Sequence, residues 1–326
     1  MSLRTPIQTV REGSVALVAF GGNVIHRSGE AGTFTEQVAN ARDMCRRLVS
    51  VISRGYELVV THGNGPQVGN LLMQNQLART LVPTLPLDVL VAQTEGSLGY
   101  ILQQELLNEL RCNQIRKDVV TIITQVMVDP QDPAFRRPSK PVGPFYSRED
   151  AERLARQFEH WQVAEDAGRG YRRIVPSPMP QRIVQSPMIR SLVYGGHVVL
   201  ALGGGGVPMT LDAAGQYVGV EAVIDKDLSS ALLARDVKAD LFVILTGMER
   251  VCLDFGTPRQ RPLDVLTHAD ARRYHAEGHF PPGSMGPKIT AATVYLEAGG
   301  REVIITDHAH LEAALDGRAG TRVVWK

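Results

Sequence analysis

The stretch that decides the fold reads Val15-Ala16-Leu17-Val18-Ala19-Phe20-Gly21-Gly22-Asn23. An unbroken apolar run of six residues that ends in glycine is typical of a parallel strand buried on both faces. Helical spacing of apolar residues follows over 36–53, then a second apolar strand over 57–61 and a helix from Pro66 to Ala78. This order predicts an α/β fold in which helices cover both faces of a mainly parallel sheet.

The same rhythm continues through the rest of the chain. Patterns of apolar residues predict further helices over 99–110, 228–237, 269–277 and 288–298, and further strands over 119–124, 197–202, 241–245, 302–306 and 321–324. We therefore expect one domain that spans residues 1–326.

Residues 129–183 depart from this rhythm, because eight prolines exclude regular helix or central strand over much of the stretch. An interdomain linker is one interpretation. We favour a protruding, lid-like subdomain inserted within the domain, since Phe135, Phe145, Tyr146, Trp161 and Tyr171 are too many aromatic residues for a solvated tether. A short helix over 149–158, capped by Ser147, is expected inside it.

Composition excludes several classes of protein. Of 326 residues, 44% are hydrophobic and the formal net charge is +1, so we expect neither nucleic-acid binding nor attachment to an anionic membrane surface. The apolar run at 15–20 is too short to span a membrane. Cys45, Cys112 and Cys252 lie far apart without metal-ligand spacing, which favours a cytoplasmic location and no protein metal site.

Lysine is rare in this chain, which has six lysines among 35 basic residues. Three of them occur in unusual settings, Pro138-Ser139-Lys140-Pro141, Asp225-Lys226-Asp227 and Gly286-Pro287-Lys288. Arg serves as the general cation here, so a retained Lys indicates a compact, mobile charge with a short reach to a phosphate oxygen.

Glycine clusters follow three of the predicted strands, at Gly21-Gly22-Asn23, Gly63-Asn64-Gly65 and Gly203–Gly206. Parallel strands end at one edge of the sheet, where glycines let backbone N–H groups approach an anion. With the three lysines, these loops predict a site for several phosphates. The P-loop and protein-kinase motifs are absent from the sequence. His62 is interpreted as a turn residue that supports its loop rather than as a general base.

Longer motifs then carry a family resemblance. They are Thr61-His62-Gly63-Asn64-Gly65-Pro66-Gln67-Val68-Gly69-Asn70, residues 138–145, Glu165–Gly170, residues 175–178, Gly203–Pro208, Gly219–Asp227 and Pro282–Lys288. In this order, over about 15–325, the chain resembles carbamate kinase of the amino-acid kinase family. The resemblance implies the amino-acid kinase fold, a three-layer α/β/α sandwich.

The resemblance also implies an activity, reversible phosphoryl transfer between ATP and carbamate to give ADP and carbamoyl phosphate. It implies that the enzyme works toward ATP synthesis, from carbamoyl phosphate released in arginine or purine breakdown. Mg²⁺ bound through nucleotide phosphates and a homodimer are implied as well.

The family pattern further implies roles for individual residues. Lys226, Lys288 and Lys140 would neutralise phosphoryl charge, and Asp227 would orient the lysines. The carbamate end would be held by Gly21, Gly22, Asn23, Gly63, Asn64 and Gly65. The nucleotide would lie near Gly204, Gly205, Asp225, Thr246, Gly247, Glu249, Gly256 and Met285.

Three positions depart from the family pattern. Glu95 stands where Gln is frequent, Glu249 where Asp is usual, and Gly286 where a bulky residue is common. If Glu95 faces the site, its charge opposes an anionic substrate; if it faces a partner subunit, it is harmless. Two alternatives therefore stay open: a kinase of another carboxylate acceptor, and a catalytically weak paralogue that binds nucleotide or carbamoyl phosphate as a sensor or subunit.

Overall fold

The computed structural model describes residues 10–27, 29–158, 161–165 and 170–326. Its centre is an eight-stranded sheet in which every neighbouring pair is parallel except β16 and β17. In spatial order the strands are β15 (Val265–Thr267), β17 (Thr321–Val324), β16 (Glu302–Asp307), β12 (Leu241–Thr246), β1 (Val15–Phe20), β2 (Glu57–His62), β9 (Val198–Ala201) and β3 (Val119–Thr121). The predicted mainly parallel sheet is confirmed.

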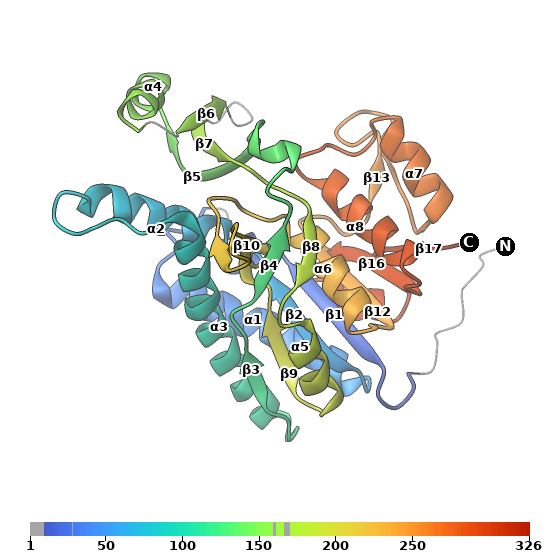
Figure 1. Ribbon diagram of the computed structural model, residues 1–326. Coiled ribbons are helices and arrows are strands. Elements are labelled where there is room, and N and C mark those ends of the chain that lie inside the picture. The colour runs from blue at the N-terminus through green and yellow to red at the C-terminus, as the bar shows by residue number, and fades with distance from the viewer. Residues whose placement is uncertain (1–9, 28, 159–160, 166–169) are drawn as a thin grey trace.

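Helices cover both faces of this sheet (Figure 1). One core packs alternate β1 residues, Ala16, Val18 and Phe20, against α1 (Phe34–Ser53), α3 (Leu87–Cys112) and α9 (Leu311–Leu315). The other packs Val15, Leu17 and Ala19 against α5 (Ser186–Tyr194), α6 (Lys226–Asp236), α7 (His268–Ala276) and α8 (Met285–Glu297). Because strand side chains alternate between faces, a strand covered on both sides must be apolar throughout.

Two predicted boundaries are wrong. The helix expected from Gly99 begins at Leu87, after Pro86 at the N-cap, and buries Leu90 and Val91 well before the predicted start. The strand expected over 119–124 leaves the central sheet at Thr121, and the N–H of Thr124 bonds the Glu95 carboxylate instead of a neighbouring strand.

Within the described residues, no helix has the length and apolar character needed to cross a membrane.

The chain then forms a second sheet of four strands. Its order is β11 (Tyr217–Gly219), β10 (Val207–Leu211), β4 (Gln125–Val128) and β8 (Pro180–Ile183). A two-stranded ribbon pairs β13 (Cys252–Leu253) with β14 (Arg261–Pro262), and α2 (Gly65–Ala78) follows β2. The sequence analysis did not predict the four-stranded sheet, since its strands are short and mix apolar with polar residues.

Most of the proline-rich stretch forms a third sheet, outside the other two (Figure 1). In it β7 (Tyr171–Val175) lies between β5 (Lys140–Tyr146) and β6 (Gln162–Glu165), and α4 (Arg148–Gln157) is capped by Ser147 as expected. β5 pairs on one side only, which allows it to carry prolines. β8 belongs to the four-stranded sheet, and part of the Glu165–Gly170 motif lies outside the described residues. The role of this subdomain as a lid stays a prediction.

Candidate active site

The glycine loops and the lysine-bearing helix meet at one edge of the central sheet. β1 ends before η1 (Gly22–Val24), β2 ends before α2, and β9 ends before η3 (Gly203–Gly205). The three strands are neighbours and parallel, so the three loops lie side by side at their carboxyl ends. This edge is where the sequence predicted a phosphate site.

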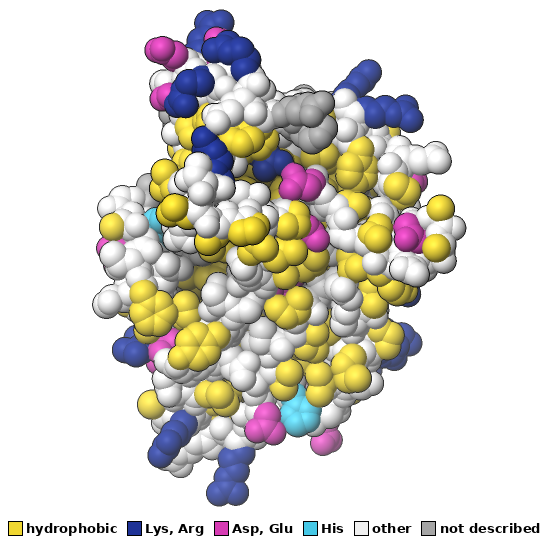
Figure 2. All heavy atoms as spheres, turned by 60° about the vertical axis from the view of Figure 1, so that its left-hand side comes forward, with side chains coloured by type: hydrophobic (Ala, Val, Ile, Leu, Met, Phe, Trp, Pro, Cys, Tyr) yellow, Lys and Arg dark blue, Asp and Glu magenta, His cyan; other side chains and the backbone are white. Residues whose placement is uncertain are grey.

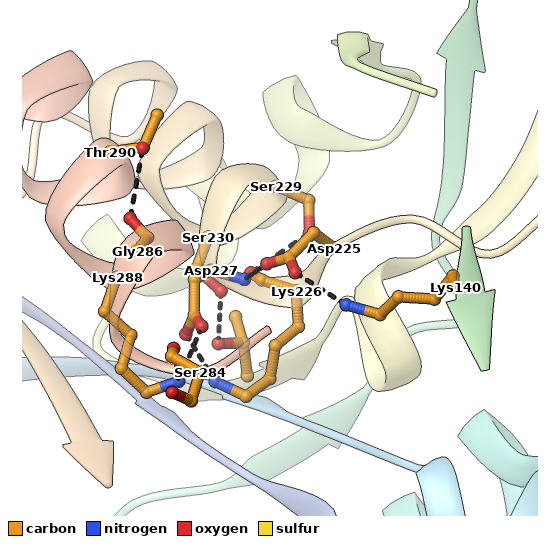
Figure 3. Close-up of polar contacts among 11 residues, drawn as sticks. Lys140, Asp225, Lys226, Asp227, Ser229, Ser230, Ser284, Gly286, Lys288 and Thr290 are labelled. Atoms are coloured by element: carbon orange, nitrogen blue, oxygen red, sulfur yellow. Dashed lines mark hydrogen bonds and ion pairs between the residues drawn. The ribbon is translucent and has the colours of Figure 1, made fainter. Parts of the chain in front are cut away.

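Two of the selected lysines share one carboxylate (Figure 3). Nζ of Lys226 lies 2.5 Å from Oδ1 of Asp227, and Nζ of Lys288 lies 3.0 Å from Oδ2. Lys226 and Asp227 occupy the first turn of α6, and Lys288 the first turn of α8. The Asp227 side chain is 4% exposed, so the two ammonium groups and their shared acid form a nearly buried cluster.

Burial and charge act on this cluster together. Burial alone would raise the pKa of Asp227, but the ammonium groups of Lys226 and Lys288 outweigh it and hold the pKa at about 2. Burial lowers the pKa of Lys226, as does the nearby Lys288, while Asp227 counters both effects. Asp227 is therefore ionised at neutral pH and offsets the repulsion between the two cations.

Lys140 approaches from the opposite side, on β5. Its Nζ lies 2.7 Å from Oδ2 of Asp225, whose Oδ1 accepts the N–H of Asp227 and so caps α6 (Figure 3). All three lysines line one cavity of about 210 Å³, which we call the lysine cavity. Its walls also include Gly63, Asn64, Gly65, Gly204, Asp225, Asp227 and Ser284.

The glycine loops touch each other through their backbones. A Cβ at Gly63 would lie 2.6 Å from the amide nitrogen of Gly22, so this approach excludes any side chain. Asn64 enters the lysine cavity, and its Nδ2 donates to Oγ1 of Thr94. Gly21, Gly22 and Asn23 are not among the described residues that line the lysine cavity. Gly22 packs against the neighbouring loop, since an added Cβ would lie 3.2 Å from the amide nitrogen of Gly65.

A second, apolar cavity adjoins the first, and Ser284 lines both. This apolar cavity, about 80 Å³, contains Thr246 and Met285 from the predicted nucleotide set. Met248, which lies between the predicted Gly247 and Glu249, lines it as well. The lining residues that the sequence analysis missed are Cys252, Phe255, His279, Phe280 and Pro281. The run Phe280-Pro281-Pro282 beside the Gly283–Lys288 motif is the one signal that could have indicated them.

The remaining residues of the predicted nucleotide set fall into two groups. Gly204 and Asp225 line the lysine cavity, whereas Gly205, Gly247, Glu249 and Gly256 are not among the described residues that line either cavity. The Glu249 carboxylate pairs with Arg250 at 3.3 Å and lies 4.0 Å from His310.

His62 and Glu95 lie beneath the third glycine loop. An added Cβ at Gly203 would come within 2.7 Å of Cγ of Glu95 and 2.8 Å of Cε1 of His62. Burial lowers the pKa of His62 to about 4, and its Nδ1 lies 3.1 Å from the Gly63 carbonyl oxygen. A neutral, loop-supporting His62 agrees with the interpretation from sequence. Glu95 is 1% exposed and lines neither cavity.

The acidic groups of the lysine cavity are already paired with lysines, and no group of three or more His, Cys, Asp or Glu side chains in the described ranges is placed to hold a metal ion. The Mg²⁺ itself stays a prediction.

Comparisons with known proteins agree with this geometry. The model of the amino acid kinase family matches residues 14–307. The carbamate kinase of Pyrococcus furiosus is 48% identical, covering 96% of this chain and 99% of its own length, and carbamate kinase 2 of Enterococcus faecalis is 43% identical over 96% and 99%. The solved carbamate kinase of Giardia lamblia bound to AMP-PNP is 38% identical, with a TM-score of 0.89 over 96% of this chain and 98% of that one. The chain therefore belongs to the amino acid kinase family, within its carbamate kinases.

Proposed function

We propose that this protein transfers a phosphoryl group reversibly between ATP and carbamate, giving ADP and carbamoyl phosphate. The observation that carries the proposal is the arrangement of Lys140, Lys226 and Lys288 around one cavity walled by two glycine loops. The carbamate kinases to which the chain is similar support the choice of acceptor.

The reaction matches what these residues supply. Carbamate is already an anion, so its attacking oxygen needs no general base, and the barrier is mainly charge repulsion and alignment. Lys226 and Lys288, converging from α6 and α8, neutralise the transferring group and the nucleotide phosphates. Asp227 holds their ammonium groups side by side, and Lys140 closes the cavity from β5.

The two cavities suggest how the nucleotide is oriented when it binds. The base and sugar occupy the apolar cavity between Met248, Phe280 and Met285, and the phosphates pass Ser284 into the lysine cavity. The carbamoyl group then lies at the far end, against Gly63, Asn64 and Gly65. Mg²⁺ supplies further charge neutralisation when it is bound to the phosphates.

The test is a coupled assay of ATP formation from ADP and carbamoyl phosphate with Mg²⁺. Turnover that depends on carbamoyl phosphate supports the proposal. Transfer from ATP to a glutamate derivative but not to carbamate would indicate the alternative acceptor. ADP binding by calorimetry without turnover of either would indicate an inactive paralogue.

We also propose that the protein is a homodimer. Large apolar side chains are exposed on α3 and on the four-stranded sheet that contacts it, among them Tyr100, Leu107, Leu211 and Tyr217. Figure 2 shows hydrophobic groups spread over the face that carries these elements. Several large apolar side chains exposed on one face are typical of a protein–protein interface, and a second copy of the chain is the occupant we expect.

A cytoplasmic location stays a prediction. Cys45, Cys112 and Cys252 are all free, which is usual for proteins of a reducing compartment.

A further inference from the structure

One face of the β5–β7 pair carries two cations and two valines. Lys140 is paired with Val175 and Val142 with Arg173 in the antiparallel register. Because alternate residues of a strand share a face, and paired residues lie on the same side of a sheet, these four side chains point in one direction. We call them the β5–β7 face.

Residues 221–225 lie along this face, where their acidic side chains pair with its cations and their central valine packs against its valines. Nη2 of Arg173 lies 2.6 Å from Oε2 of Glu221, and Nζ of Lys140 lies 2.7 Å from Oδ2 of Asp225. Between the two ion pairs, Val223 packs in one apolar cluster with Val142 and Val175. The N–H of Val223 also donates to the Pro176 carbonyl oxygen at 3.0 Å.

The Arg173–Glu221 pair anchors this arrangement to the body of the molecule. Oε1 of Glu221 accepts the N–H of Leu87 at the start of α3, so Glu221 joins β7 to that helix. Arg173 is 8% exposed, with its guanidinium 5.0 Å from the centre of the Trp161 ring. Both residues line a separate cavity of about 310 Å³ rather than the lysine cavity.

The position of the Lys140 side chain depends on such an anchor more than the positions of Lys226 and Lys288 do. Its side chain is 40% exposed, against 13% for Lys226 and 15% for Lys288. Lys226 and Lys288 are fixed by helices of the central core, whereas Lys140 is carried by an edge strand outside it. An error of about 1 Å in the position of a catalytic group can cost about a hundredfold in rate.

We infer that Arg173 and Glu221 are positioning residues, which hold the β5–β7 face against residues 221–225 and thereby set the reach of Lys140 into the lysine cavity. This inference rests on the proposed function for its kinetic consequences. It adds a pair of residues that touch neither substrate nor nucleotide.

The test is a double-mutant cycle of Arg173→Gln and Lys140→Ala, read as kcat/KM for carbamoyl phosphate. If Arg173 acts through Lys140, Arg173→Gln lowers kcat/KM about tenfold when Lys140 is present and less than twofold in the Lys140→Ala background. Affinity for ADP, measured by calorimetry, stays within twofold. An equal loss in both backgrounds, or no loss with Lys140 present, would overturn the inference.

Glu221→Gln is the second variant, because Glu221 is half exposed and its substitution keeps the contact between Arg173 and the Trp161 ring. It should reproduce the loss caused by Arg173→Gln. Arg153→Gln, which removes an exposed pair with Asp150 on α4, is the matched control in the same subdomain and should leave kcat/KM unchanged.

Hydrogen–deuterium exchange of the unliganded protein separates this inference from the proposed function. In Arg173→Gln the amides of β5 and β7 should exchange at least about tenfold faster, while those of β1 and β12 keep their rates. Wild-type protein without turnover would contradict the proposed function alone. Unchanged exchange in β5 and β7 would contradict the positioning role whatever the activity.

Discussion

Lys226 and Lys288 bind opposite oxygens of the same carboxylate, that of Asp227. Lys226 is adjacent to Asp227 in the sequence, whereas Lys288 lies 61 residues away from it and arrives on another helix. Positions on distant faces of the molecule would have contradicted the hypothesis of a phosphate site. The convergence of the two lysines instead leads to the first two predictions.

Lys226→Ala and Lys288→Ala should each lower turnover at least about a hundredfold, because each removes charge neutralisation at the transferring group. The fold should survive, since both side chains line the lysine cavity rather than the hydrophobic core. Steady-state kinetics with circular dichroism checks this, with the exposed Lys326→Ala as control. Near-normal turnover of either variant would refute its role.

Asp227→Asn should change the acid stability of the protein. The folded pKa of Asp227, about 2, is below its ordinary value of 3.8, so its ionisation stabilises the fold above about pH 4. That contribution is lost as pH falls toward 2. In urea unfolding at pH 6, the free energy of unfolding of the wild type should therefore exceed that of the variant by at least about 1 kcal/mol. This difference should become smaller as the pH falls toward 2. A constant gap would contradict the prediction.

Much of the fold could be predicted from periodicity, and particular residues explain where this failed. The run at 15–20 identified the central strand because burial on both faces leaves no polar position. The start of α3 was missed because Gly96 and Gly99 weaken the helical pattern, while contacts of Leu87 and Leu90 stabilise the earlier turns. Thr124 interrupts the strand predicted after Val119 through a side-chain contact that no local pattern encodes.

For the site, unusual local settings in the sequence were enough to indicate Lys140, Lys226 and Lys288. The Arg173–Glu221 pair and most of the wall of the apolar cavity could not be predicted, because ordinary residue types far apart in sequence form them. Glu249 was assigned by its place in a motif; its carboxylate is paired with Arg250, and its role near the nucleotide stays a prediction. Motifs predict which loops meet, while the direction of each side chain depends on packing.

Gly204→Ala should weaken carbamoyl phosphate binding. Gly204 has φ +69°, and an added Cβ would collide with the side-chain amide of Asn64, which would be pushed away from the cavity wall. We expect at least about a tenfold rise in KM for carbamoyl phosphate. Gly215→Ala is the matched control, since Gly215 has φ +76° with open space around it. It should cost about 1 kcal/mol of stability and no activity. Equal kinetics in the two variants would count against this role.

Tyr100→Glu should disrupt self-association. Tyr100 is 61% exposed on α3, so a carboxylate there costs the monomer little, whereas burying it in an interface is unfavourable. Light scattering coupled to size-exclusion chromatography should give a dimer for wild type and a monomer for the variant. A monomeric wild type, or a variant that remains dimeric, would contradict the proposed interface.

Glu95 connects α3 to the third glycine loop. Its Oε2 accepts the N–H of Thr124, whose Oγ1 accepts the N–H of Leu202. Leu202 has φ +53°, a left-handed conformation that costs a non-glycine residue about 1–2 kcal/mol and needs such support. Within the described residues, Oε1 of Glu95 has no hydrogen-bond partner, and burial raises the pKa of this carboxyl well above its usual value.

Glu95→Gln should therefore stabilise the protein increasingly as pH rises. A carboxyl whose folded pKa is raised binds its proton more tightly when folded, so the wild type loses stability as pH increases from about 4.5 toward the folded pKa. Gln keeps an acceptor for the N–H of Thr124 and cannot ionise. Urea unfolding between pH 5 and 8 should show that the free energy of unfolding of the variant, relative to that of the wild type, increases steadily with pH. Parallel curves for the two proteins would mean that Glu95 is ionised within the fold, with its charge balanced by a neighbouring group.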